Sequence, residues 1–135
     1  MMIALLMIVL MKLLDLPYIY YNGKIITKAP LTEKEIVQFE TNEDLEAFNT
    51  DGLRSLLYTM SHVSHMKEKT LRYPGHAEKI QILKDLGFFS QHKRSIKNII
   101  YKPIDIVSDL LEEDWLLREG DEEFTVMKII LETST

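Results

Sequence analysis

The chain has 135 residues, of which 46% are hydrophobic and 27% are charged, a composition typical of one folded globular domain. Sixteen Lys and Arg residues against twenty-one Asp and Glu residues give a net charge of −5. This balance argues against a nucleic-acid partner, because phosphate binding draws on clustered cations. The absence of cysteine excludes disulfides, thiolate metal sites and thiol nucleophiles, and it suits a reducing cytoplasm, where we expect the protein to be located.

The N-terminal segment is uninterruptedly apolar from Met1 to Met11. It is too short for a membrane span, which requires about 20 apolar residues. It also lacks the positive first region and the small-residue cleavage site of a signal peptide. We therefore expect no membrane partner. The segment predicts a helix over residues 2–14, stopped before Pro17 and covered by the domain or by a partner chain.

A β-hairpin is predicted next. The β-rich runs 18–21 and 24–27 flank Asn22-Gly23, which is the strongest short signal for a two-residue hairpin turn. A further short strand is expected at residues 36–39.

The following stretch contains sequence signals that are typical of helices. Residues 41–44 (Thr-Asn-Glu-Asp) can cap a helical turn that continues through residues 45–48. Leucines recur at helical spacing in residues 53–57.

The middle of the chain combines an extended segment with a helix. Residues 67–73 predict a strand that leads into Pro74-Gly75. Apolar residues then recur through residues 76–86 at the spacing of an amphipathic helix, and Gly87 is suited to the left-handed cap that ends it.

After a polar loop, a helix is predicted over residues 103–111, with proline in its first turn, and a strand over residues 124–131. The order of elements indicates an α+β domain, expected to hold a mixed sheet with an inserted helical part. We divide the chain into an α/β part (about 1–66), a pocket segment with the helical insertion (about 67–115) and a return strand (about 120–132).

Few patterns indicate chemistry. The five glycines are scattered, so no dinucleotide loop or P-loop is present and no cofactor is assigned to this chain. His62 and His65 could share a helix face and bind zinc with His76, or simply form polar surface; we assign no metal. The carboxylates at 112–113 and 121–123 are interpreted as solvated, and no catalytic residue is assigned.

Arg72 is the residue that most resembles a binding group. It lies in an extended run directly before a Pro-Gly turn that opens a helix, and its planar fork can hold a carboxylate in two hydrogen bonds. The backbone N–H groups and dipole of the helix also favour an anion there. A structural ion pair and a ligand contact both explain such an arginine. Tyr73 could flank the ligand, and the turn at residues 49–52 is either a second polar part of the site or a helix cap.

Several ordered motifs resemble the C-terminal region of saccharopine dehydrogenases and related lysine dehydrogenases, over roughly residues 17–131. The motifs are residues 48–56 (Phe-Asn-Thr-Asp-Gly-Leu-Arg-Ser-Leu), 69–79 (Lys-Thr-Leu-Arg-Tyr-Pro-Gly-His-Ala-Glu-Lys), 83–88 (Leu-Lys-Asp-Leu-Gly-Phe) and 115–127, which resembles the return strand of that region.

The resemblance implies a domain that binds a lysine-derived amino acid and forms a homodimer, next to a separate Rossmann domain that carries NAD(P) for a reaction at a C–N bond. It places Arg72 on the carboxylate of an amino-acid-like small molecule, with Tyr73, Asn49 and Asp51 around the same pocket. Some members carry an Asn-Arg-Asp turn where this chain has Asn49-Thr50-Asp51, and the missing cation weakens any claim that saccharopine itself is the substrate.

The predicted function is therefore the substrate-binding and dimerisation portion of an NAD(P)-dependent oxidoreductase. This sequence lacks the nucleotide-binding domain, so it is predicted to be inactive by itself. The alternatives are a stand-alone amino-acid-binding module and a purely structural dimerisation module.

Overall fold

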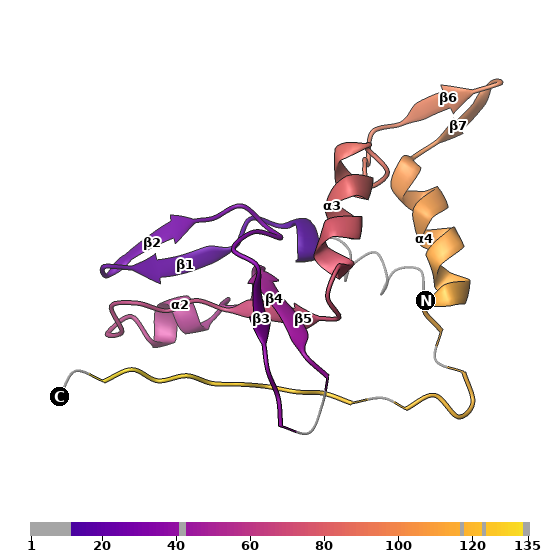
Figure 1. Cartoon of the computed structure of the whole chain (residues 1–135). Helices are drawn as coiled ribbons and strands as arrows, with labels where there is room; N and C mark the ends of the chain where they lie inside the picture. Colours follow the sequence, from indigo (N-terminus) through magenta and orange to yellow (C-terminus); the bar gives the residue numbers. More distant parts are fainter. Residues whose placement is uncertain (1–11, 41–42, 117, 123, 134–135) are drawn as a thin grey trace.

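A computed structural model describes residues 12–40, 43–116, 118–122 and 124–133, and Figure 1 shows how their elements are arranged. The elements in chain order are β1 (Tyr18–Tyr21), β2 (Lys24–Thr27), β3 (Glu35–Val37), β4 (Leu45–Asn49), α2 (Leu56–Thr59), β5 (Lys69–Arg72), α3 (His76–Asp85), β6 (Arg94–Ile96), β7 (Ile99–Tyr101) and α4 (Pro103–Asp114). Residues 12–14 are also helical; the rest of the predicted N-terminal helix lies outside the described residues.

The first hairpin is confirmed. Strands β1 and β2 pair antiparallel, and the turn residues Asn22 and Gly23 have φ angles of 50° and 71°. Positive φ at both central positions defines the turn whose twist matches that of the strands, which is why Asn-Gly is favoured there. An antiparallel bridge between Tyr20 and Met66 connects this hairpin to the segment that precedes β5.

A three-stranded sheet in the order β3-β4-β5 positions the site described below. Its strands β3 and β5 confirm the extended segments predicted near residues 36–39 and 67–73. The predicted helical turn through residues 45–48 is wrong, because these residues belong to β4, the central strand. A central strand that is buried on both faces loses the alternation of polar and apolar residues that would identify it.

The predicted α+β class is confirmed, but the predicted mixed sheet is not found. Every strand pair in the described part of the chain is antiparallel. Two of these pairs are joined by two-residue turns, which reverse the chain, whereas a parallel pair requires a long crossover connection.

The two longer helices follow their sequence signals. Helix α3 ends as predicted, with Gly87 at φ 82°. The N–H of Gly87 donates to the Lys84 carbonyl (2.9 Å) and that of Phe88 to the Leu83 carbonyl (3.0 Å), which satisfies the last carbonyls of the helix. Helix α4 begins with Pro103, whose fixed φ and missing N–H suit the first helical position. Helix α2 is a single turn that begins at Leu56, within the predicted stretch 53–57, and ends just beyond it at Thr59.

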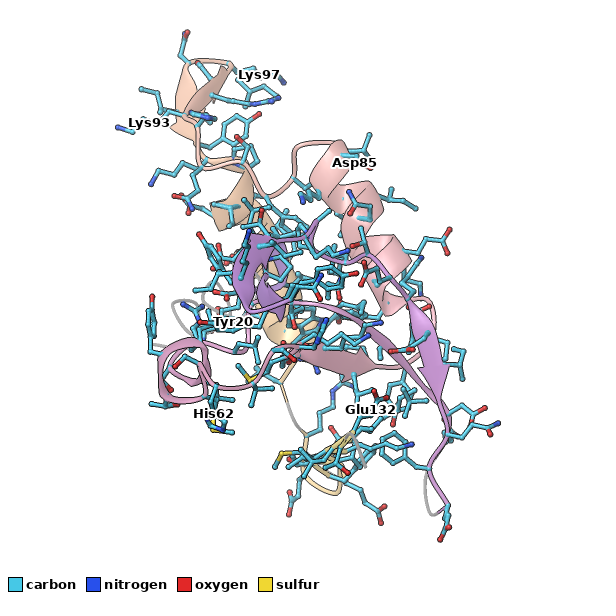
Figure 2. The ribbon with its side chains drawn as sticks, turned by 90° about the vertical axis from the view of Figure 1, so that its left-hand side faces the viewer. Tyr20, His62, Asp85, Lys93, Lys97 and Glu132 are labelled. Atoms are coloured by element: carbon cyan, nitrogen blue, oxygen red, sulfur yellow. The ribbon has the colours of Figure 1, made fainter. Side chains whose placement is uncertain are left out.

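A second hairpin, β6–β7, occupies part of what the sequence suggested was a polar loop. Its turn residues Lys97 and Asn98 have φ angles of 47° and 66°, the same turn geometry as in the first hairpin but without glycine. Figure 2 shows that Lys93 and Lys97 project with this hairpin away from the rest of the molecule, at the opposite end from Glu132.

The predicted return strand at residues 124–131 is wrong for the described part of this segment, which pairs with no other strand. Its composition is that of a strand, but a strand forms only beside a neighbour that accepts its backbone hydrogen bonds. Figure 1 shows the segment (yellow) passing the sheet as an extended chain. Met127, Ile129 and Leu131 are accordingly 80%, 73% and 84% exposed.

The core lies between the sheet, α3 and α4, which run side by side (Figure 1). Phe48 of β4 is fully buried and packs in one cluster with residues of both helices. The other buried members of this cluster are Leu13, Leu31, Ala77, Ile80, Phe89 and Val107. Ala77 follows directly after His76 on α3, and Ile80 lies one turn further along. Their packing in the core therefore also fixes the first turn of that helix.

Within the described residues, no helix combines the length and the apolar character needed to cross a membrane.

Candidate functional site

A cavity of about 230 Å³ lies where the end of β5 meets the beginning of α3 and the end of α4, and it is lined by Leu13, Arg72, His76 and Trp115. This volume is smaller than the roughly 300–1,000 Å³ of pockets for drug-sized ligands. The cavity therefore has the size for a small metabolite.

The turn between β5 and α3 brings two of the lining residues together. Arg72 is the last residue of β5 and His76 is the first of α3. Between them, Gly75 adopts φ 88°, a left-handed conformation that costs glycine little because it has no Cβ. The His76 N–H donates to the Tyr73 carbonyl (3.2 Å), which closes the turn. The predicted segment thus has the predicted shape, a strand followed by a Pro-Gly turn and a helix.

Arg72 forms no ion pair with an acidic side chain among the described residues. A structural ion pair with one of these residues therefore does not explain the arginine. Its side chain is exposed, and Nη1 donates to the carbonyl oxygen of the neighbouring Leu71 (2.7 Å). A guanidinium has five N–H donors in a planar fork, so this single hydrogen bond leaves most of the fork available to an anion in the cavity.

His76 and Trp115 form the wall beside it. Their ring centroids are 6.5 Å apart with an interplanar angle of 37°. Burial lowers the pKa of His76 below its usual value, and the positive charges of Arg72 and Lys79 lower it further, while Glu46 raises it. The imidazole is therefore neutral at pH 7, and its Nε2 is buried without a hydrogen-bond partner among the described residues.

Glu46 belongs to the same group of residues. In the register of β4 and β5 it lies directly opposite Arg72, and side chains at directly opposite positions share one face of the sheet. Its Oε1 atom is buried and, in the described part of the chain, also has no hydrogen-bond partner. The sequence patterns did not point to Glu46 or Trp115, and they suggested His76 only as a third zinc ligand.

The other predicted site residues lie elsewhere. Asn49 is 1% exposed, and its Nδ2 donates to Thr32 Oγ1 (3.2 Å). Because side chains alternate along a strand, Asn49 faces the side of the sheet opposite to Glu46 and Arg72. The Asp51 carboxylate pairs with Arg54 (3.0 Å). Tyr73 is next to Arg72 but is 54% exposed and does not line the cavity. Of the four predicted residues, Arg72 alone lines this cavity.

A second polar cluster lies at the other end of β5. Thr50 Oγ1 donates to Glu68 Oε2 (2.8 Å) and lies 2.7 Å from Thr70 Oγ1. Burial raises the pKa of Glu68 and the charge of Asp51 raises it further, while the two threonine hydroxyls lower it. The Glu68 carboxylate also occupies the space that a Cβ at Gly52 would need. This cluster satisfies its own hydrogen bonds and explains why a glycine follows Asp51.

His62 and His65 lie in the segment between α2 and β5. Within the described ranges, no group of three or more His, Cys, Asp or Glu side chains could hold a metal ion. His65 instead contacts the Tyr21 ring edge-on, at 5.2 Å between centroids, and its Nδ1 lies 3.1 Å from Ser64 Oγ. His62 is exposed and points outward from its loop (Figure 2).

The lowered pKa of His76 predicts a contribution to acid sensitivity. Below pH 6.5 the unfolded chain takes up a proton at this residue that the folded chain does not, until the pH reaches the lower pKa of the folded state. The free energy of unfolding therefore decreases as the pH falls through this window. We expect the His76→Gln variant to lose less stability than the wild type between pH 7.5 and pH 5.5, measured by urea unfolding. The exposed His62→Gln variant serves as control, and equal losses in wild type and His76→Gln would contradict the prediction.

Residues 6–134 match the family described as "Saccharopine dehydrogenase C-terminal domain". The match includes the strand that carries Glu46 and the β5–turn–α3 unit with Arg72 and His76, and it covers nearly the whole chain. The chain therefore belongs to the saccharopine dehydrogenase C-terminal domain family.

Proposed function

We propose that this domain forms one wall of the amino-acid pocket of an NAD(P)-dependent oxidoreductase of the saccharopine dehydrogenase type, acting at a C–N bond of a lysine-derived amino acid. In this function Arg72 holds the carboxylate of the ligand. The observation that carries the proposal is a guanidinium without an acidic partner among the described residues, placed at the edge of a cavity of suitable size.

The chemistry of the cavity supports a carboxylate as the group that is bound. The arginine fork matches the two oxygens of a carboxylate, and the beginning of α3 adds the positive end of a helix dipole. Tyr73, at the adjacent position, flanks the opening in this proposal. Asn49 and Asp51 then act indirectly, by stabilising the end of β4 and the turn after it.

The residues of this chain do not fit the nicotinamide dinucleotide itself. A dinucleotide fold binds the pyrophosphate at a strand-to-helix turn rich in glycine. The β5–α3 turn contains one glycine, Gly75, and is followed directly by the half-buried His76. In the proposed enzyme a Rossmann domain separate from these residues binds NAD(P). The present residues bind and orient the amino acid, and we assign no general base.

A second candidate is a stand-alone amino-acid-binding or structural dimerisation module. The homodimer and the cytoplasmic location are part of the proposal in both cases. The exposed apolar side chains of residues 127–131 offer a surface that a second copy could cover.

The carboxylate site can be tested with two ligands that differ only in the carboxyl group. We expect L-lysine to bind the 135-residue chain in isothermal titration calorimetry, and L-lysinamide to bind at least about 10-fold more weakly, because the neutral amide offers the guanidinium fork no negative charge and only one acceptor oxygen. Equal binding of both ligands, or binding of neither, would rule out the carboxylate site. A folded dimer that binds neither ligand would support the structural module instead.

A further inference from the structure

The β6–β7 hairpin is a two-stranded sheet that projects beyond the ends of α3 and α4 (Figure 1). All residues from 91 to 100 are exposed. A two-stranded hairpin that stands alone in water is marginally stable at best, and a further strand or packing against a helix stabilises it. Its turn has positive φ at Lys97 and Asn98 without the help of glycine, so the turn does not compensate for the missing packing. Within the described part of the chain, the hairpin therefore lacks the packing that would stabilise it.

One face of the hairpin is apolar. Ile96 and Ile99 lie directly opposite each other in the register of the two strands, so their side chains are neighbours on one face. They are 59% and 66% exposed. Because side chains alternate along a strand, Tyr101 belongs to the same face as Ile99. Adjacent exposed apolar side chains of this kind mark an interaction surface.

The hairpin is also the cationic part of an acidic protein. Residues 92–102, which we call the arm, contain four Lys and Arg residues and no Asp or Glu, whereas the whole chain has a net charge of −5. None of the four cations forms an ion pair among the described residues. They are Lys93, Arg94, Lys97 and Lys102. The surface that covers the arm should therefore be apolar at its centre and acidic around it.

The outer face of α4 has these properties. Ile106 and Leu110 are 46% and 67% exposed, and a separation of four residues makes them neighbours on one side of the helix. Residues 103–116 contain five Asp and Glu residues and no Lys or Arg. None of these five carboxylates forms an ion pair in the described structure. The acidic residues are Asp105, Asp109, Glu112, Glu113 and Asp114.

The arm does not cover the α4 of its own chain. It leads into the beginning of α4 and projects away from that helix (Figures 1 and 2). It does match the length of the α4 of another molecule. Helix α4 has 12 residues and is about 18 Å long, and residues 92–97, extended at roughly 3.3 Å per residue, span about 20 Å. When two copies are related by a two-fold axis, each arm can lie on the α4 of the other, so the contact forms twice.

We propose that the arm of one copy packs on the outer face of α4 of a second copy, and that the exchange is reciprocal. The apolar centre of the contact is Ile96 and Ile99 against Ile106 and Leu110, and the cations of the arm lie among the carboxylates of α4. This inference rests on the homodimer of the proposed function and names its contact surface. The carboxylate site at Arg72 does not depend on it.

Charge reversal on each side of the contact tests the exchange. The arm variant is Lys93→Glu/Lys97→Glu, and the helix variant is Asp109→Lys/Glu113→Lys; all four side chains are exposed. We expect the wild type to form dimers in sedimentation velocity, and each variant to dissociate with a Kd at least about 10-fold higher, since like charges meet at both contacts. An equimolar mixture of the two variants should regain the wild-type Kd. In the mixed pair one contact has both charges reversed and the other is unchanged, so opposite charges meet at both.

The matched control is Lys24→Glu/Lys34→Glu, which changes the net charge by the same amount at exposed positions outside the arm; it should dimerise like the wild type. A misfolded variant would not recover on mixing, so recovery also shows that both variants are folded. If the variants dimerise like the wild type, or the mixture does not recover, the arm is not exchanged while the homodimer stands.

Two other outcomes overturn the inference in different ways. A wild type that stays monomeric at every accessible concentration would remove both the exchange and the homodimer of the proposed function. If that monomer binds phosphatidylserine vesicles in a sedimentation assay and the arm variant does not, the arm binds an anionic lipid surface instead of a second copy.

Discussion

Replacing Arg72 with alanine is expected to weaken L-lysine binding at least about 30-fold, corresponding to a loss of roughly 2–5 kcal/mol for a charge-assisted carboxylate contact. The arginine lines the cavity, and within the described residues its side chain donates a hydrogen bond to the Leu71 carbonyl. Removing it therefore takes the cationic partner of the ligand's carboxylate from the site without breaking an ion pair within the described part of the fold. Calorimetric titration of the variant with L-lysine gives the change in Kd.

Two further variants make this result specific. Arg72→Lys keeps the charge but not the planar fork, so it should recover only part of the affinity. Arg54→Ala removes a half-exposed arginine that pairs with Asp51 (3.0 Å) and does not line the cavity; it should bind L-lysine like the wild type. Unchanged affinity in Arg72→Ala would refute a direct contact between Arg72 and the ligand.

The Phe48→Ala variant should show the largest loss of stability, about 3–5 kcal/mol in the free energy of unfolding. Phe48 is a fully buried residue of β4 and packs in one cluster with Ala77 and Ile80 of α3. Truncating it removes the burial of an aromatic ring and leaves a void that rigid neighbours cannot fill. Urea unfolding followed by circular dichroism measures this loss.

The size of the void can be checked by graded substitutions. Phe48→Leu should lose clearly less than Phe48→Ala, because leucine fills more of the space. Phe124→Ala changes the same residue type at a position that is 50% exposed, and it should change the stability by no more than about 0.5 kcal/mol. A loss in Phe48→Ala no larger than that of Phe124→Ala would mean that this core does not hold the sheet against α3.

The elements that could be predicted from the sequence are those specified by local chemistry. The hairpin at Asn22-Gly23 and the ends of α3 and α4 depend on residues whose backbone preferences act within a few positions. Arg72 could be predicted for the same reason, since the strand, the Pro-Gly turn and the helix that present it are consecutive in the chain.

The elements that were missed depend on neighbours distant in sequence. Residues 45–48 form a strand because β3 and β5 lie on both sides of them, which no short window of sequence contains. Residues 124–131 have the composition of a strand but find no neighbour in the described part of the chain. The local composition indicates which secondary structure a segment can adopt. Whether it becomes part of a sheet depends on a neighbouring strand that pairs with it.

The same limit applies to the site. Glu46 and Trp115 come from β4 and from the end of α4, and only the folded chain places them beside the β5–α3 turn. Asn49 belongs to the same strand as Glu46, but it pairs with Lys69, at the end of β5 away from Arg72. A shift of one residue along a strand exchanges the two faces of the sheet, so its side chain is directed away from the cavity.

The walls of the cavity are tethered in different ways. Arg72 and His76 are separated by three residues, one of them a proline with a restricted φ, so the chain itself limits how far apart they can move. Trp115 follows directly after α4, which comes after the β6–β7 hairpin in the chain, and noncovalent packing holds it beside His76. In the proposed amino-acid site, the position of the indole would therefore set which aliphatic tail lengths are accepted, while the contact of Arg72 with the carboxylate would stay the same.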